Sequence, residues 1–331
     1  RSWSICDNTI DSINCGQEDG FGASINQAAI FLHVRDMEME GVKVDGNTIR
    51  NPGSKGILIS DDTGGSYVLN HECVSVSHNS IRLNGAATVW AYHGIELNLM
   101  NDIPDATAVG QSSMLNWIVQ GNQVQYNYDT LATGDYVDTT SVGIKWTLFH
   151  SADAPTGDTH ALLRQITVDG NQVRNYRFCG IYFWIESLPL IDVVTDQIHI
   201  ANNTTRTLDH LAHTSGAGFY FDFRGSFSFS VNTISNNTAL LTRSPAPVAT
   251  NQAGFWWFLD ITPRSMMVSN NMARGFDNNR ACQYTLGGGT PWVPDSGICH
   301  DNLTDDNPAG TGWATAATEW SNMNWHNNYN T

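Results

Sequence analysis

A short pattern of alternating apolar residues followed by an asparagine recurs along the whole chain, and it limits the fold more than any other feature. One copy consists of Ile166 and Val168 with Asn171 three positions later. A supersecondary unit that recurs at this spacing indicates a repeat protein, in which each unit packs against its neighbours. The asparagines of the nine copies are Asn8, Asn47, Asn79, Asn122, Asn171, Asn203, Asn237, Asn271 and Asn302.

A second pattern, a glycine followed by alternating large apolar residues, is interleaved with the first at the same drifting period. Its copies begin at Gly56, Gly94, Gly143, Gly180, Gly218 and Gly254. We infer that both strands belong to one coil and that loops absorb the length differences. Because short strands of this kind cannot bury a face alone, successive coils must stack as parallel strands around a common apolar interior. An asparagine suits the tight turn after each strand, so we expect the stacked asparagines to form a ladder.

On these two repeats the chain resembles the pectin-lyase-like superfamily over nearly its whole length. The resemblance implies an all-β fold, a right-handed single-stranded parallel β-helix (a solenoid) of about nine coils with long loop insertions. The superfamily includes polysaccharide-active enzymes and phage tailspikes, so it implies a glycan partner. It does not fix the reaction, because different functions are built on one scaffold.

We expect one domain over residues 1–331, with an N-terminal coil at 1–40, regular coils at 41–273 and an irregular C-terminal cap at 274–331. Long insertions are expected at 101–113, 126–141 and 147–161, where they could form one wall of a groove. The chain opens directly on a strand, so residue 1 is expected to follow a removed leader or an upstream domain.

The net charge of −16 argues against a nucleic acid or an anionic membrane as the partner, since either needs a basic surface. No apolar run is long enough for a transmembrane helix, so we expect no membrane insertion. Six cysteines permit disulfides at Cys6–Cys15 and Cys282–Cys299, or they are all reduced thiols; disulfides would fit an extracellular protein, secreted or virion-associated. The sequence holds no recognisable metal-ligand cluster, and we predict neither a metal nor a cofactor.

Alternation gives every residue of the glycine-led strands a direction. Residues such as Ile181 and Phe183 point inward, and their alternates stack outward about 4.8 Å apart from coil to coil. The first outward column is Leu58, Glu96, Lys145, Tyr182, Tyr220 and Trp256. The second is Ser60, Asn98, Thr147, Trp184, Asp222 and Phe258, and the third is Glu186, Arg224 and Asp260.

Several aromatic rings with interspersed charges on one face suit a sugar chain, whose C–H faces stack on rings while its hydroxyl and acidic groups contact polar side chains. The alternative is that long loops or a neighbouring subunit cover the rings. The substrate-binding residues that we predict are Tyr182, Trp184, Tyr220, Arg224, Trp256 and His93.

Glycoside hydrolysis needs a proton donor and a base or nucleophile on either side of the bond, and carboxylates supply both. Our candidates are Glu186, Asp222 and Asp260, followed by Glu96 and Lys145. The alternative is that the third column, and likewise Glu96 with Lys145, are structural salt bridges. A lyase would instead use Lys145 or Arg224 as the base at a uronic acid.

The polygalacturonase branch of the superfamily carries paired aspartates, a Gly-His-Gly and an Arg-Ile-Lys in successive copies of this strand. Here His93-Gly94-Ile95 and Gly143-Ile144-Lys145 are similar to the second and third, although the third lacks its arginine. Ser54-Lys55 occupies the place of the aspartates, and Asp61-Asp62 are expected after the strand instead. The acids of that chemistry therefore do not carry over.

We predict a polysaccharide-degrading β-helix, with a glycoside hydrolase favoured over a lyase. The abrupt start and the aromatic C-terminal end favour a phage tailspike depolymerase, which would assemble as a homotrimer. The alternatives are a non-catalytic glycan-binding, adhesin or structural spike module, and a secreted uronate polysaccharide lyase.

Overall fold

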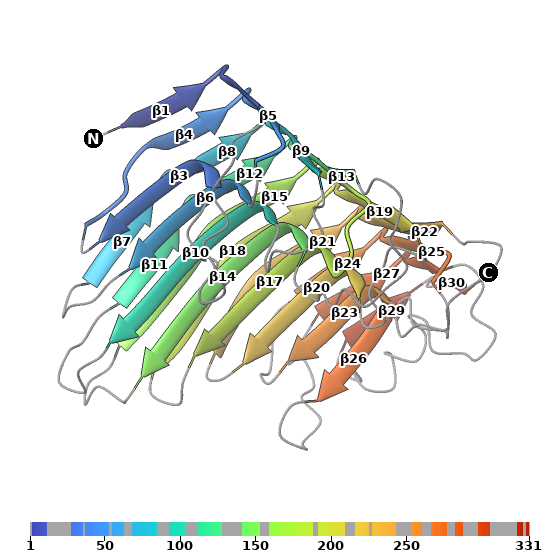
Figure 1. Cartoon of the computed structure of the whole chain (residues 1–331). Coiled ribbons are helices and arrows are strands. Elements are labelled where there is room, and N and C mark those ends of the chain that lie inside the picture. The colour runs from blue at the N-terminus through green and yellow to red at the C-terminus, as the bar shows by residue number, and fades with distance from the viewer. Residues whose placement is uncertain are drawn as a thin grey trace.

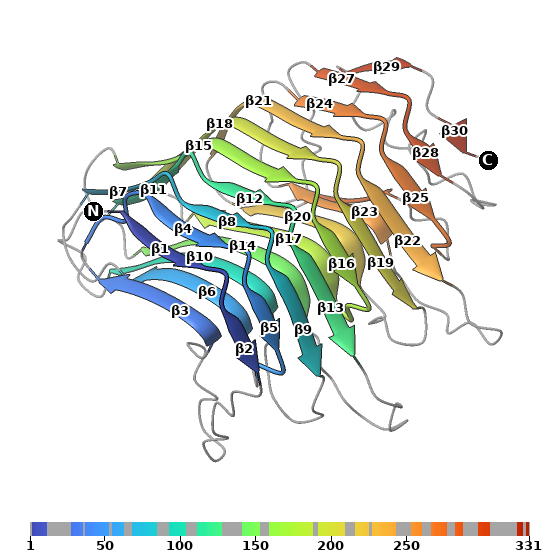
Figure 2. The ribbon, with the colours of Figure 1, turned by 90° about the horizontal axis from the view of Figure 1, so that it is seen from above.

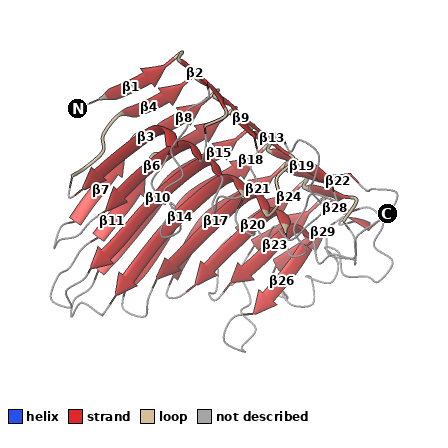
Figure 3. Ribbon diagram, in the orientation of Figure 1, coloured by secondary structure: helices blue, strands red, loops and turns tan. Residues whose placement is uncertain are grey.

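The computed structural model describes residues 2–11, 28–35, 37–52, 55–62, 68–84, 93–103, 111–127, 141–152, 159–187, 191–208, 216–224, 227–242, 253–259, 266–276, 282–286, 297–304, 323–326 and 329–330. In this part of the chain every regular element is a β-strand (Figure 3). The strands form three sheets in which neighbours pair in parallel (Figure 1). No helix of the described residues could cross a membrane.

Sheet A runs β1 (Trp3–Cys6), β4 (Val42–Asp45), β8 (Ser75–Ser77), β12 (Ile118–Gln120), β15 (Thr159–Asp169), β18 (Ile191–Ala201), β21 (Phe227–Ser235), β24 (Met266–Ser269), β27 (Gly297–His300) and β29 (Met323–His326). Two further strands of this sheet, β7 (Val68–Glu72) and β11 (Gln111–Leu115), pair with each other, and β11 also pairs with β15.

Sheet B runs β2 (Thr9–Asp11), β5 (Thr48–Arg50), β9 (Ser80–Asn84), β13 (Gln123–Asn127), β16 (Gln172–Arg174), β19 (Thr204–Leu208), β22 (Thr238–Thr242), β25 (Met272–Arg274), β28 (Leu303–Thr304) and β30 (Tyr329–Asn330). Sheet C runs β3 (Ala28–Arg35), β6 (Lys55–Asp62), β10 (His93–Ile103), β14 (Val142–Ala152), β17 (Cys179–Ser187), β20 (Ala217–Arg224), β23 (Ala253–Leu259) and β26 (Cys282–Leu286).

The chain passes repeatedly from sheet A to sheet B to sheet C, and each strand lies beside the matching strand of the previous repeat (Figures 1 and 2). Both predicted strand series are confirmed, and the architecture is compatible with a parallel β-helix. Strands β26 to β30 continue the three sheets beyond Arg274.

The predicted inward residues form one apolar core between the sheets. Their side chains stack from strand to strand, as Phe183, Phe221 and Trp257 do with ring centroids 5.7 and 4.2 Å apart. Stacking of this kind removes large apolar areas from water, which is the main source of stability for strands that cannot fold alone.

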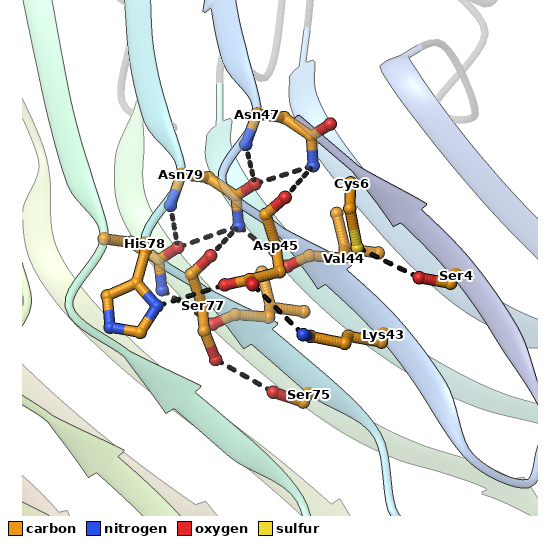
Figure 4. Close-up of polar contacts among 12 residues, drawn as sticks. Ser4, Cys6, Lys43, Val44, Asp45, Asn47, Ser75, Ser77, His78 and Asn79 are labelled. Atoms are coloured by element: carbon orange, nitrogen blue, oxygen red, sulfur yellow. Dashed lines mark hydrogen bonds and ion pairs between the residues drawn. The ribbon is translucent and has the colours of Figure 1, made fainter. Parts of the chain in front are cut away.

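The nine repeat asparagines form the expected ladder, and part of it is shown in Figure 4. Asn171 represents the buried members: its Nδ2 donates to Asn203 Oδ1 at 2.9 Å, and its Oδ1 accepts from the backbone N–H and Nδ2 of Asn122. The residue before each ladder asparagine has a left-handed backbone, with φ between 53° and 69°. The left-handed backbone thus falls on the residue before the asparagine, and asparagine itself recurs because its side-chain amide bonds the neighbouring ladder asparagines and a backbone carbonyl of the previous repeat.

The repeated glycine of sheet C lies where sheets B and C approach each other closely. A Cβ atom at Gly143 would be 2.6 Å from the carbonyl oxygen of Gly180 and would also clash with Val173. The same position in the neighbouring strands is equally crowded, as at Gly94 and Gly180. Glycine recurs there because no side chain fits.

Two expectations about strand ends need correction. Asp61 and Asp62 belong to β6 rather than following it, and Asp61 is buried beside His71, with 3.0 Å between Asp61 Oδ2 and His71 Nε2. The 101–113 and 147–161 segments are partly strand, because β10 and β14 extend to Ile103 and Ala152 and β11 and β15 begin at Gln111 and Thr159. Residues 104–110, 128–140 and 153–158 lie outside the described residues, so the groove wall stays a prediction.

Of the two alternatives for the cysteines, the described residues support reduced thiols, and neither Cys6–Cys15 nor Cys282–Cys299 forms a disulfide. Cys6 and Cys299 are free thiols, as are Cys73 and Cys179. The physical reason at the C-terminal end is position, because Cys299 packs into the core from sheet A whereas Cys282 belongs to a strand of sheet C. Cys15 lies outside the described residues.

Candidate functional site

The predicted outward columns lie on the outer face of sheet C in the expected register. In the first column Glu96 pairs with Lys145, Lys145 with Tyr182, Tyr182 with Tyr220, and Tyr220 with Trp256. None of these side chains belongs to the core between the sheets. The prediction that these residues of five strands lie on one face is therefore confirmed.

The aromatic side chains of this face stack on one another more tightly than expected. The rings of Tyr182 and Tyr220 lie 4.8 Å apart at 13°, and those of Tyr220 and Trp256 lie 4.9 Å apart at 25°. Phe178 packs edge-on against both tyrosines. Tyr220 is only 8% exposed and both of its ring faces are covered, whereas Tyr182 and Trp256 are half-buried. A ligand would meet ring edges and the ends of the stack rather than a row of open faces.

Asp222, on the second column, is a fully buried acid beside this stack. Its Oδ2 accepts a hydrogen bond of 3.1 Å from the hydroxyl of Tyr182 on the neighbouring strand. Burial raises the pKa of Tyr182, and the negative charge of Asp222 raises it further. Tyr182 is thus a neutral donor that holds Asp222 in place.

A buried cluster of charges occupies the N-terminal half of the same face. Glu96 lies between two lysines, with its Oε2 2.5 Å from Lys55 Nζ and its Oε1 3.4 Å from Lys145 Nζ. The His93 ring lies beside this carboxylate, with its Nε2 3.9 Å from Glu96 Oε2. The other ring nitrogen, Nδ1, accepts a hydrogen bond from the backbone N–H of Val142. Lys55, His93 and Glu96 are all buried.

The charges of this cluster set the protonation state of Glu96. Burial alone would raise the pKa of its carboxyl, but His93, Lys145 and Lys55 together outweigh burial and lower it to about 2. For Lys55 burial is the largest influence, and it lowers the pKa even though Glu96 opposes the change. Glu96 therefore remains ionised at neutral pH and is unsuited to donate a proton.

Two unpartnered polar atoms lie next to this cluster, on the second column. Asn98 Oδ1 and Thr147 Oγ1 are buried, and among the described residues neither has a hydrogen-bond partner. The two residues are neighbours in register, and Trp184 follows Thr147 on the next strand. The ammonium of Lys145 lies 5.6 Å from the centroid of the Trp184 ring, within cation–π range.

Sequence reasoning missed Lys55, Asn98 and Thr147 as site residues. Lys55 precedes Gly56 just as His93 precedes Gly94, so the comparison with His93 could have found it, whereas strict alternation would have grouped it with the inward Ile57. Asn98 and Thr147 were placed on the second column, but no sequence signal showed that their polar atoms lack partners.

The third column is only partly described. Glu186 and Arg224 lie opposite each other in β17 and β20, as predicted, but their side chains are outside the described part of the chain. Asp260 is outside it altogether. The distances between the carboxylates of Glu186, Asp222 and Asp260 therefore stay a prediction, and so does the alternative salt bridge of Glu186 and Asp260 with Arg224.

Among the described residues, no group of three or more histidine, cysteine, aspartate or glutamate side chains could hold a metal ion.

Compared with known proteins, the chain matches no family model, no curated sequence and no solved structure.

Proposed function

We propose that the protein is a right-handed single-stranded parallel β-helix of the pectin-lyase-like superfamily that binds a polysaccharide on the outer face of sheet C and hydrolyses it. The observation that carries the proposal is the pair of buried atoms Asn98 Oδ1 and Thr147 Oγ1, which have no hydrogen-bond partner among the described residues and belong to the same column as Trp184. Buried polar groups normally have partners, so such atoms on an outer face favour a ligand with many hydroxyl groups. The nearby aromatic stack supplies the apolar contacts that sugar rings need.

Asp222 and Glu186 are the proposed acid and base pair. They lie on neighbouring strands two residues apart along the strand, which places their Cα atoms roughly 8 Å apart. That separation is compatible with an inverting hydrolase, in which a water molecule must fit between carboxylate and sugar. Because Tyr182 donates to Asp222, Asp222 would act as the base and Glu186 as the acid.

Glu96 has a supporting role in this proposal. Its low pKa keeps it charged, so it would hold Lys145 beside Trp184 rather than exchange a proton. Lys145 would then contact hydroxyl or acidic groups of the glycan. A tailspike depolymerase that assembles as a homotrimer outside the cell is the setting that we propose, and sedimentation of the purified chain tests the trimer.

A non-catalytic glycan-binding module is the second candidate. Two observations favour it: Asp222 is completely buried, and both ring faces of Tyr220 are occupied. It predicts binding of a glycan without cleavage.

The test is a reducing-end assay on acidic and neutral capsular and plant polysaccharides, with Asp222→Asn and Glu186→Gln as site variants. Asp196→Asn is the matched control, because Asp196 lies on sheet A in a partly exposed pair with Arg164. We expect each site variant to lose at least about a hundredfold in turnover while the control keeps full activity. Full activity in both site variants would refute the assignment.

Two other results of the assay identify the alternatives. A product that absorbs in the near ultraviolet would reveal an elimination and hence a lyase. Binding of a glycan with no new reducing ends would support the non-catalytic module.

A further inference from the structure

A column of arginines runs along the outer face of sheet B, away from the site on sheet C. Arg50 and Arg82 are neighbours in register, and so are Arg174 and Arg206. Gln125 joins the two pairs, and Leu240 separates Arg206 from Arg274. The strands that carry them, β5 to β25, lie side by side in Figure 2. At about 4.8 Å per strand, the five guanidinium groups extend over roughly 29 Å.

These arginines are exposed, and no acidic side chain of the described residues neutralises them. All five are exposed, and none has a carboxylate partner among the described residues. Two of them donate hydrogen bonds to neutral groups: Arg174 Nη2 to Gln172 Oε1 and Arg206 Nε to Thr242 Oγ1, both at 3.3 Å. Arg164 on sheet A, by contrast, is paired with Asp196.

The absence of acids from this face is notable in an acidic protein. The chain has 32 acidic and 16 basic residues, yet within their described bounds the strands of sheet B from β5 to β30 contain neither aspartate nor glutamate. Asp11, opposite Arg50 at the end of the sheet, is the acid of β2. The remaining outward positions are mostly polar and uncharged, among them Thr48, Ser80, Gln123, Gln172, Thr204 and Thr238.

Like charges directly opposite each other on neighbouring strands destabilise a sheet. The pairs Arg50–Arg82 and Arg174–Arg206 therefore carry a repulsion that threonine or glutamine at the same positions would not have. An anion that spans several strands would turn this repulsion into attraction, because guanidinium groups bind carboxylate and similar oxyanions in two-pronged hydrogen bonds.

We propose that the arginine column binds an extended acidic polysaccharide that lies along sheet B, parallel to the stacking direction of the strands. The acidic groups would contact the guanidinium groups, and the sugar hydroxyls would contact the flanking threonine, serine and glutamine side chains. This surface is separate from sheet C and does not depend on cleavage there.

A polysaccharide fits this column better than a nucleic acid does. The arginines form one column across neighbouring strands, whereas the phosphates of a duplex wind around its axis and carry one charge per roughly 1.7 Å. A net charge of −16 would repel so dense a polyanion, but less so a chain with one acidic group on each sugar or every second sugar.

The test compares charge-matched double variants of the whole chain. Arg174→Gln/Arg206→Gln removes two charges from the column, and Lys43→Gln/Arg164→Gln removes two charges from exposed, acid-paired residues of sheet A. Calorimetric titration measures the dissociation constant for polygalacturonate and for chondroitin sulfate, which carries sulfate groups as well. Dextran is the neutral comparison, and duplex DNA is the polyanion of the other class.

We expect wild type to bind one or both acidic polysaccharides but not dextran, and the column variant to bind roughly tenfold more weakly. The sheet A variant should change by less than about twofold, and added salt should weaken wild-type binding. Asp222→Asn should leave this binding unchanged even if it abolishes cleavage. The proposal fails if wild type binds neither acidic polysaccharide, if both double variants weaken binding equally, or if DNA binds as tightly.

Discussion

Lys55 and Glu96 form a buried ion pair between neighbouring strands of sheet C, with 2.5 Å between Lys55 Nζ and Glu96 Oε2. Both side chains are nearly inaccessible to water. Taking two charges out of water is costly, and their attraction offsets that cost only while both are present. The pair therefore makes the stability of this face depend on one carboxylate.

Glu96→Gln should lower the free energy of unfolding by roughly 3–5 kcal/mol, because it leaves the buried ammonium of Lys55 without its counter-charge. Chemical denaturation followed by fluorescence measures the change. Asp196→Asn, which breaks a partly exposed pair with Arg164, should cost at most about 1 kcal/mol. Equal effects of the two substitutions would show that burial adds nothing to the Glu96 pair.

Acid should destabilise the wild-type protein through the same carboxylate. The pKa of Glu96 is lowered in the folded state from 4.5 to about 2, so its contribution is complete above about pH 4.5 and is lost as the pH falls toward 2. A difference of this size corresponds to roughly 3 kcal/mol. Denaturation curves at several pH values should show a smaller loss across this range in Glu96→Gln than in wild type; parallel losses would contradict the assigned cause.

Asn171→Ala should destabilise the protein by roughly 2–4 kcal/mol. The substitution leaves buried groups of Asn122, Asn203 and Val119 without the hydrogen bonds that the Asn171 side chain supplies. Thermal or chemical denaturation measures the effect. Asn8→Ala is the control, because Asn8 is exposed at the end of the ladder and should cost less than about 1 kcal/mol. A similar cost at both positions would mean that the ladder does not act through buried hydrogen bonds.

Tyr182→Phe tests the geometry around Asp222 and rests on the proposed function. Removing the donor should lower turnover roughly tenfold and shift the pH profile of the reaction, since the hydroxyl holds the Asp222 carboxylate. Tyr126→Phe makes the same chemical change in the core, where the hydroxyl donates to the Val142 carbonyl at 2.6 Å. The control should lose stability but keep its pH profile; an unchanged profile in Tyr182→Phe would remove Tyr182 from the mechanism.

Much of the fold was predictable from local pattern. The alternation of side chains along a strand predicted the two directions in β17, where Phe183 points inward and Tyr182 points outward. The interleaved asparagine and glycine positions fixed which strands are neighbours. These features follow from backbone geometry that repeats in every coil, so one copy explains the others.

The site was predictable only as far as direction and register go. That Tyr182, Tyr220 and Trp256 stack followed from the sequence, but the coverage of both Tyr220 faces did not. Disulfides could not be judged from an even number of cysteines either, since Cys299 packs into the core.

The sequence by itself determined two series of parallel strands in successive coils, the asparagine ladder and the outward columns of the glycine-led strands, because all of them depend on spacing along the strand. Only the tertiary structure decided that Lys55 and Glu96 meet as a buried pair and that Asn98 and Thr147 keep unpartnered polar atoms. The five arginines of sheet B each stand three positions after a ladder asparagine, so their register follows from spacing, and only the structure showed that they are exposed. Burial and pairing depend on what several distant segments bring to the same place, and no single repeat contains that information.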